Sequence, residues 1–248
     1  MVITKHFLAD KMGIDFEIAT YFADRRVPEN NNYWGKRPLY LRFGTGFLFL
    51  PVIYDLLYKS GLEKSLVIDE ARVVRMEESF AIVTEYESEQ ISFEQYTNKM
   101  ADLYRPVVVN QQMFDDLLSH FRNEQTKVYK FGSGVPALDR ADAFLLNFVD
   151  LTTDEDFMKT LITRWYHIAV AVLMLDDLVD IDKDRGNADE NALLQLGDNS
   201  AAVNKCTFII EQHLDALALI NPKAAGFFRK VLDHAMQEDA VKLMKTRD

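Results

Sequence analysis

Three carboxylates stand at the end of an unbroken apolar run in the C-terminal third of the chain. Ile168–Leu175 is a run of eight apolar residues that leads directly into Asp176, Asp177 and Asp180. Ionised carboxylates in an apolar setting are costly unless they are paired or bound to a metal. On a helix, Asp176, Asp180 and Asp184 follow one another at intervals of four residues, so they project from one side of the cylinder. Such oxygen ligands suit Mg²⁺, which takes one or two carboxylates and fills its other positions with water and phosphate oxygens.

The segment 175–184, LDDLVDIDKD, resembles the aspartate-rich DDxxD motif of the class I isoprenoid synthases. This helical-bundle superfamily contains the prenyl diphosphate synthases and the terpene synthases. Because the segment lies in the C-terminal third of the chain, it is most similar to the second aspartate-rich motif of the trans-prenyltransferases. The resemblance implies that more than one Mg²⁺ ion bridges Asp176, Asp177, Asp180 and Asp184 to an isoprenoid diphosphate substrate. It implies prenyl transfer or terpene cyclisation, which share the ionisation of an allylic diphosphate as their first step.

A prenyltransferase with two motifs also carries an earlier acidic cluster on a facing helix. The segment Glu78–Glu89 is the best-positioned candidate, with Glu85 and Glu89 in place of the family's aspartates. The resemblance therefore implies that these two glutamates complete the metal site. The chain departs from the family pattern in having no aspartate pair there, and in the short interval of 91 residues between Glu85 and Asp176.

Basic and aromatic residues elsewhere are candidates for contacts with substrate. The sequence Gly35–Pro38, GKRP, is similar to the basic patch that holds the homoallylic diphosphate in the family, which would give Lys36 and Arg37 a substrate-binding role. Trp165 precedes the aspartates by about three helical turns on the same stripe. Since aromatic rings dominate both protein cores and apolar ligand sites, we expect Trp165 in the core or on the wall of a substrate pocket.

Other interpretations of the aspartates stay open. They could be the exposed end of a helix that leaves the core, although acidic residues near a helix C-terminus oppose the macrodipole. Asp180, Asp182 and Asp184 begin like an EF-hand calcium loop, but Arg185 stands where that loop needs Gly and Asn191 where it needs Glu. The chain could also be a degenerate relative of the isoprenoid synthases that keeps the fold and serves as a binding or partner subunit.

Composition limits the fold and the partners. Gly 10 and Pro 6 are few and hydrophobic residues make up 48% of the 248 residues, which favours a large helical core over a turn-rich β protein. The net charge of −11 argues against nucleic acid as a partner. Cys206 is the single cysteine, which excludes an internal disulfide and fits a reducing, cytoplasmic setting. No apolar segment suits a transmembrane span, and homodimer formation is left open.

The expected fold is an all-α bundle in one domain, residues 1–248, resembling the isoprenoid synthase fold with a central apolar cavity. Helical patterns cover approximately residues 3–23, 39–59, 64–87, 92–105, 106–123, 136–149, 153–186, 200–220 and 222–245, and the helix that carries Trp165 should run unbroken to about Asp180. Ser92 opens one helix with a capping box, Thr153 can cap the helix that carries Trp165, and Asn221 precedes a proline at the first helical position. Asp115 and Asp116 are assigned to a solvated helix face.

Overall fold

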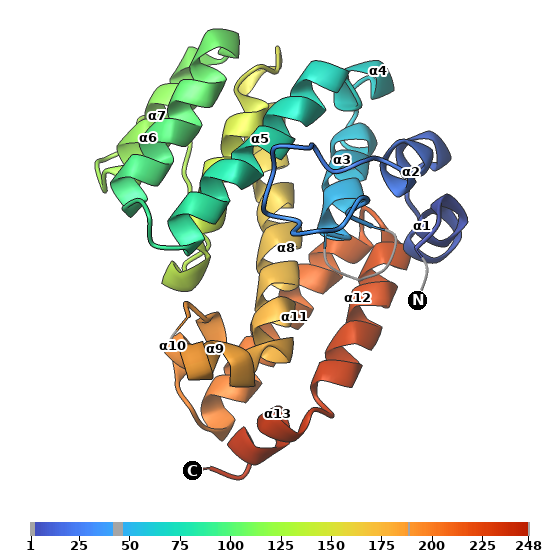
Figure 1. Ribbon diagram of the computed structural model, residues 1–248, viewed down its shortest axis with the longest axis vertical. Helices are drawn as coiled ribbons and strands as arrows, with labels where there is room; N and C mark the ends of the chain where they lie inside the picture. The colour runs from blue at the N-terminus through green and yellow to red at the C-terminus, as the bar shows by residue number, and fades with distance from the viewer. Residues whose placement is uncertain (1–2, 42–46, 188, 248) are drawn as a thin grey trace.

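The computed structural model describes residues 3–41, 47–187 and 189–247 (Figure 1). Helices make up 69% of the described residues, and these ranges contain no strand beyond an isolated bridge between Arg26 and Leu39. The prediction of an all-α protein is therefore confirmed. The α-helices are α1 (Lys5–Met12), α2 (Phe16–Ala23), α3 (Phe49–Lys59), α4 (Lys64–Val67), α5 (Glu70–Glu87), α6 (Phe93–Tyr104), α7 (Gln111–Phe121), α8 (Glu155–Val179), α9 (Ile181–Asn187), α10 (Ala192–Leu196), α11 (Ser200–Ala218), α12 (Pro222–Ala235) and α13 (Asp239–Met244), and the 3₁₀ helices are η1 (Arg105–Val107) and η2 (Pro136–Phe148).

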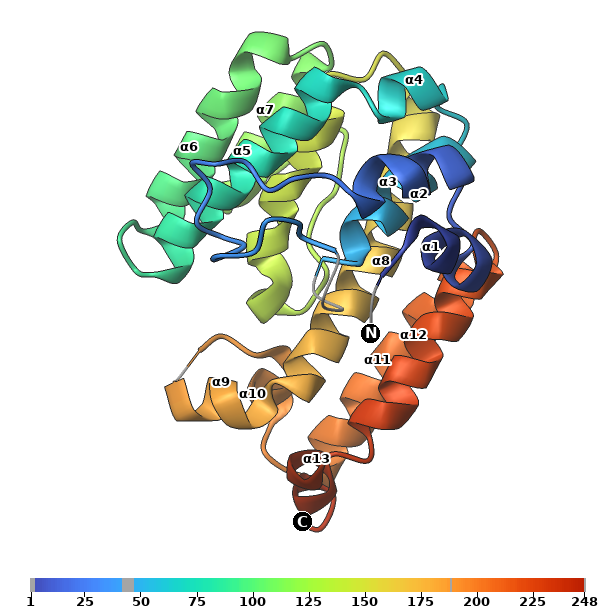
Figure 2. The ribbon, with the colours of Figure 1, turned by 45° about the vertical axis from the view of Figure 1, so that its right-hand side comes forward.

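The long helix α8 is the centre of the bundle. It packs against α3, α10, α11, α12 and η2, and Figure 1 shows it running between α5–α7 on one side and α11–α12 on the other. Figure 2 shows α9 and α10 beside its C-terminal end. The apolar stripe of α8 is buried at Leu161, Trp165 and Ile168, which explains its central position. Among the described residues, no helix combines the length and the hydropathy that crossing a membrane requires.

The predicted course of α8 agrees with the structure except at its cap. Asp154, and not Thr153, is the N-cap, and its side chain accepts a hydrogen bond from the Phe157 backbone N–H. Asp154 is one residue closer to the first turn, so its carboxylate can reach this donor. The helix then runs unbroken to Val179, as predicted. Asp180 is its C-cap, and the predicted continuation to Gly186 is a separate helix, α9.

Several predicted helices are shorter than their apolar patterns. The segment 3–23 divides into α1 and α2 at Gly13, whose φ of 66° is left-handed and ends α1. The segment 39–59 begins its helix at Phe49; residues 39–41 are not helical, and 42–46 lie outside the described residues. The segment 222–245 is divided into α12 and α13. The capping box at Ser92 and the N-cap at Asn221 are confirmed.

The assignment of Asp116 to a solvated face is wrong. Asp116 on α7 is buried, and its carboxylate accepts hydrogen bonds from the backbone N–H groups of Lys127, Val128 and Tyr129 at 2.8, 2.9 and 2.9 Å. Burial by itself would raise the pKa of Asp116, but these bonds outweigh it and the pKa is lowered. Asp116 therefore fixes the loop that follows α7, while its neighbour Asp115 is exposed.

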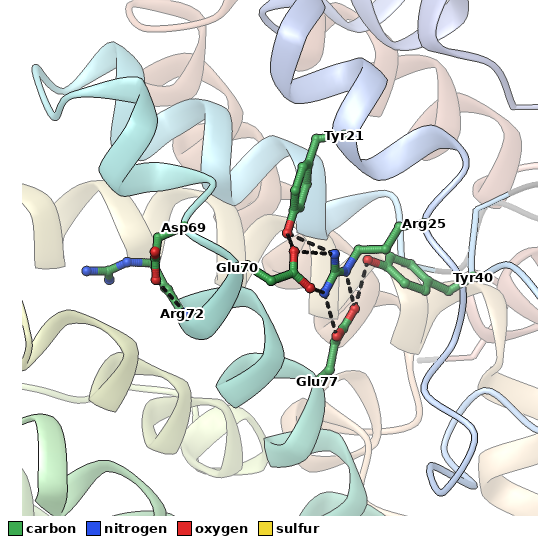
Figure 3. Close-up of polar contacts among 7 residues, drawn as sticks. All are labelled: Tyr21, Arg25, Tyr40, Asp69, Glu70, Arg72 and Glu77. Carbon is green, nitrogen blue, oxygen red and sulfur yellow. Dashed lines mark hydrogen bonds and ion pairs between the residues drawn. The ribbon is translucent and has the colours of Figure 1, made fainter.

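A second polar cluster joins α2 to α5 (Figure 3). The guanidinium of Arg25, in the segment that follows α2, binds the carboxylates of Glu70 and Glu77, which lie two turns apart on α5. The side chain of Glu77 is 3% exposed, whereas that of Glu70 is 66% exposed. The hydroxyls of Tyr21 and Tyr40 donate to Glu70 and Glu77 respectively. This cluster fixes the orientation of α5, whose far end reaches the candidate site.

Candidate functional site

A cavity of about 350 Å³ lies between α3, α5, η2, α8 and α12. A volume of this size is within the range of small-molecule sites, roughly 300–1,000 Å³. The described part of its lining is mostly apolar, and its aromatic members are Tyr33, Phe47, Phe49, Tyr54, Phe80, Tyr86, Tyr96, Phe144, Phe148, Trp165, Phe227 and Phe228. The cavity is therefore suited to an apolar group.

Four charged side chains belong to the described lining: Arg72, Glu87, Arg140 and Asp176. Arg72 is already engaged, because it is buried, donates to the Asn147 backbone carbonyl at 2.8 Å and forms an ion pair with Asp150 at 2.8 Å. This leaves Glu87, Arg140 and Asp176 as the groups that could meet a polar part of a ligand.

Glu87 and Asp176 stand at the ends of two helices that line the same cavity. Glu87 lies in the last turn of α5 and Asp176 in the last turn of α8. Tyr33 lines the same cavity; burial raises its pKa, and the negative charges of Glu87 and Asp176 raise it further. The two helix ends therefore bring together acidic groups that are 89 residues apart in the sequence (176 − 87).

The two carboxylates combine access to solvent with partial desolvation. Both residues are solvent-exposed, yet the surrounding protein partly desolvates each carboxylate. Desolvation raises the pKa of Glu87, with Asp176 adding to the effect and Arg140 opposing it. Desolvation likewise raises the pKa of Asp176, and the charges of Asp180 and Asp184 add to it. A cation or a proton at this end would be bound favourably.

The other predicted aspartates are turned away from the cavity. The carboxylate of Asp177 is buried and accepts a hydrogen bond from the Ala192 backbone N–H at 2.7 Å, and burial raises its pKa to about 7. Asn191 donates to Asp184 and to the Asp177 backbone carbonyl, both at 2.8 Å. Asp177 and Asp184 thus anchor the start of α10. Asp180 pairs with Lys183 at 3.1 Å at the surface.

Helix phase explains why Glu87, and not Glu85 or Glu89, lines the cavity. Glu85 is partly exposed and forms an ion pair with Lys99, and Glu89 is exposed beyond the end of α5. Glu87 instead continues the stripe of Phe80 and Val83, which also line the cavity, at spacings of three and four residues. The resemblance favoured Glu85 and Glu89 in this acidic segment. The helical spacing from Phe80 is the signal in the sequence that identifies Glu87.

The predicted substrate-binding residues differ in their position relative to the cavity. Trp165 lines the cavity, and its Nε1 is buried with no hydrogen-bond partner among the described residues. Lys36 is exposed and is not among the described lining residues. The guanidinium of Arg37 lies over the ring of Phe47, 4.9 Å from its centroid, and Phe47 lines the cavity. Arg140 on η2 was not predicted, and no motif surrounds it.

The carboxylates at the cavity are too few to enclose Mg²⁺ without other ligands. No group of three or more His, Cys, Asp or Glu side chains in the described part of the chain is arranged to hold a metal ion. Mg²⁺ is commonly bound by one or two carboxylates together with phosphate oxygens and water. Asp176 and Glu87 therefore fit an ion that arrives with a phosphorylated ligand, and they do not form a protein cage for a bare ion.

Comparison with known proteins does not assign a family to the chain. No family model matches the chain, and no match is found among curated proteins or solved structures.

Proposed function

We propose that this protein is a Mg²⁺-dependent enzyme that uses an isoprenoid diphosphate, by prenyl transfer or by cyclisation. The observation that carries the proposal is the position of Asp176 and Glu87 at the same end of an aromatic-lined cavity. The hydrocarbon chain of the substrate would fill the apolar part. Its diphosphate would lie at the carboxylates and complete the coordination of Mg²⁺.

The residues divide into a polar and an apolar group. Asp176 and Glu87 would hold the metal, which neutralises the diphosphate as a leaving group when bound. Arg140 lies at the cavity, with its guanidinium 3.3 Å from Glu190, and would add a positive charge toward a phosphate oxygen. Phe80, Phe144 and the other aromatic walls would exclude water and present π faces to an allylic cation.

The test compares three single variants of similar size. Mg²⁺ with diphosphate should raise the melting temperature of the wild-type protein more than either alone, because each completes the other's coordination. Asp176→Asn and Glu87→Gln should lose this synergy. Glu85→Gln is the matched control, since it removes a charge two residues away on the same helix from a side chain paired with Lys99. Equal synergy in all three variants would remove Asp176 and Glu87 from the site.

Turnover is measured separately. The wild-type protein incubated with geranyl or farnesyl diphosphate, with and without isopentenyl diphosphate, should release inorganic diphosphate. Asp176→Asn and Glu87→Gln should release little, and Glu85→Gln should match the wild type. Absence of release from every substrate by a protein that keeps the Mg²⁺–diphosphate synergy would refute the enzymatic proposal.

One observation favours a binding or partner subunit as the second candidate. Asp177 and Asp184 are hydrogen-bonded to the start of α10, so the cavity has fewer carboxylates than the family's two motifs supply. A protein of this kind would bind an isoprenoid diphosphate and keep it intact. Stoichiometric recovery of unchanged ligand from the complex would support this function over catalysis.

A further inference from the structure

Two histidines meet at the interface of α8 and α11, away from the described cavity lining. The Nδ1 atoms of His167 and His213 are 3.3 Å apart. The centroids of the two rings are 5.4 Å apart, farther than the nitrogens, so the rings approach through their Nδ1 edges instead of stacking. Both side chains are half-buried, and solvent reaches the pair.

The distance between the nitrogens matches the spacing of two ligands on a tetrahedral metal ion. Imidazole nitrogens bound at about 2.05 Å to a tetrahedral centre are about 3.3 Å apart. A direct hydrogen bond from nitrogen is usually shorter, about 2.9–3.0 Å between heavy atoms. The observed 3.3 Å is therefore long for a direct bond and suitable for an ion between the rings.

The protonation of the pair also suits metal binding. Burial lowers the pKa of His167, and the positive charge of Arg164 lowers it further. Burial lowers the pKa of His213, the neighbouring His167 adds to this, and the Tyr166 carbonyl opposes it as a hydrogen-bond acceptor. Both rings are thus neutral at pH 7, which is the form that binds metals.

We propose that His167 and His213 bind one late first-row transition ion, such as Zn²⁺, through their Nδ1 atoms. Imidazole is a preferred ligand of Zn²⁺, Cu²⁺ and Ni²⁺. Among the described residues no third His, Cys, Asp or Glu side chain completes the group, so water fills the other positions. In the metal-free pair, one ring carries a proton on Nδ1. When the ion binds, this proton moves to Nε2 of the same ring, so both rings stay neutral and no net proton is released. The ion joins α8 to α11 and does not depend on the proposed function of the cavity.

Calorimetric titration of the tag-free, chelator-treated protein with ZnCl₂ at pH 7.5 tests the proposal. The wild-type protein should bind one equivalent saturably, and its melting temperature should rise. His167→Gln and His213→Gln should each lose this equivalent, because glutamine offers no imidazole nitrogen. His234→Gln is the matched control, since the His234 side chain is 83% exposed and separate from the pair; it should bind like the wild type. Retention of the equivalent in both His167→Gln and His213→Gln would overturn the proposal.

If either variant fails to fold, nitrogen NMR of the wild-type imidazoles tests whether Zn²⁺ binds through the two Nδ1 atoms. Zn²⁺ should shift two Nδ1 resonances and leave their Nε2 partners protonated. Shifts confined to Nε2 atoms, or to a single histidine, would overturn the assignment. Asp176→Asn should keep the equivalent, which separates this site from the cavity.

Discussion

Glu77→Gln should destabilise the protein far more than Glu70→Gln, although both carboxylates bind the same guanidinium (Figure 3). Arg25 Nε and Nη2 donate to the two Glu77 oxygens at 2.5 and 2.9 Å. Its Nη1 and Nη2 donate to the Glu70 oxygens at 3.0 and 2.8 Å. The geometry of the two pairs is similar. Their environments differ, since the Glu77 side chain is 3% exposed and the Glu70 side chain 66%.

The expected magnitudes follow from this difference in burial. Removing one partner of a buried ion pair costs about 3–5 kcal/mol, because the remaining charge is left unpaired. Glutamine keeps one acceptor and Arg25 keeps Glu70, so we expect about 3 kcal/mol for Glu77→Gln, at the low end of that range. An exposed pair is worth about 0–1 kcal/mol, which we expect for Glu70→Gln. The two variants should therefore differ by about 2 kcal/mol or more.

Two hydrogen bonds connect the backbone at Glu77 to the cavity. Asn31 donates to the Glu77 backbone carbonyl at 2.8 Å, and the Asn31 side-chain oxygen accepts from the Tyr33 backbone N–H at 2.9 Å. Tyr33 lines the cavity beside Glu87 and Asp176. Because glutamine keeps this backbone carbonyl, Glu77→Gln should lower stability and leave ligand binding at the cavity unchanged.

Urea unfolding followed by far-UV circular dichroism measures both variants against the wild type. The slope of the free energy with urea should be unchanged, so that the midpoints report stability directly. If the two substitutions cost the same within about 0.5 kcal/mol, burial would not control the strength of the Arg25 pairs and the reasoning would fail.

Three further predictions concern the cavity and the loop after α7. Ala169 on α8 lines the cavity, so Ala169→Phe should fill it and abolish the thermal shift produced by farnesyl diphosphate with Mg²⁺ while the protein stays folded; an unchanged shift would place the ligand elsewhere. Trp165 lines the cavity with an unpartnered Nε1 among the described residues, so Trp165→Phe should cost less than about 1 kcal/mol in urea and remove the fluorescence change on ligand addition. The pKa of Asp116 is lower in the folded than in the unfolded protein, so its contribution is present above about pH 4 and is lost as pH falls through the folded value. Asp116→Asn should therefore cost about 1–3 kcal/mol at pH 7 and progressively less as the pH falls below about 4, and a cost in urea unfolding that does not change between pH 7 and the lowest pH at which the protein folds would contradict this.

Local sequence determined the helices and the direction of single side chains on them. Trp165 and Asp176 are eleven residues apart, about three turns, and periodicity alone predicted that they share a stripe of α8. The same periodicity places Glu87 on the stripe of Phe80 and Val83. Helix ends were less predictable, because an apolar pattern continues across Gly13, where a left-handed backbone ends α1.

The tertiary structure decided which of these stripes meet. The ends of α5 and α8 bring Glu87 to Asp176, and α11 brings His213 to His167, 46 residues away in sequence. Asp177 and Asp184 belong to the same acidic motif as Asp176, yet the backbone and side chain at Asn191 and Ala192 hold them away from the cavity. Asp116 is buried for a similar reason, since the loop that follows α7 supplies three N–H donors. Helical periodicity fixes the side of the cylinder on which a residue stands, but the partner on that side comes from contacts between distant segments, which no local pattern encodes.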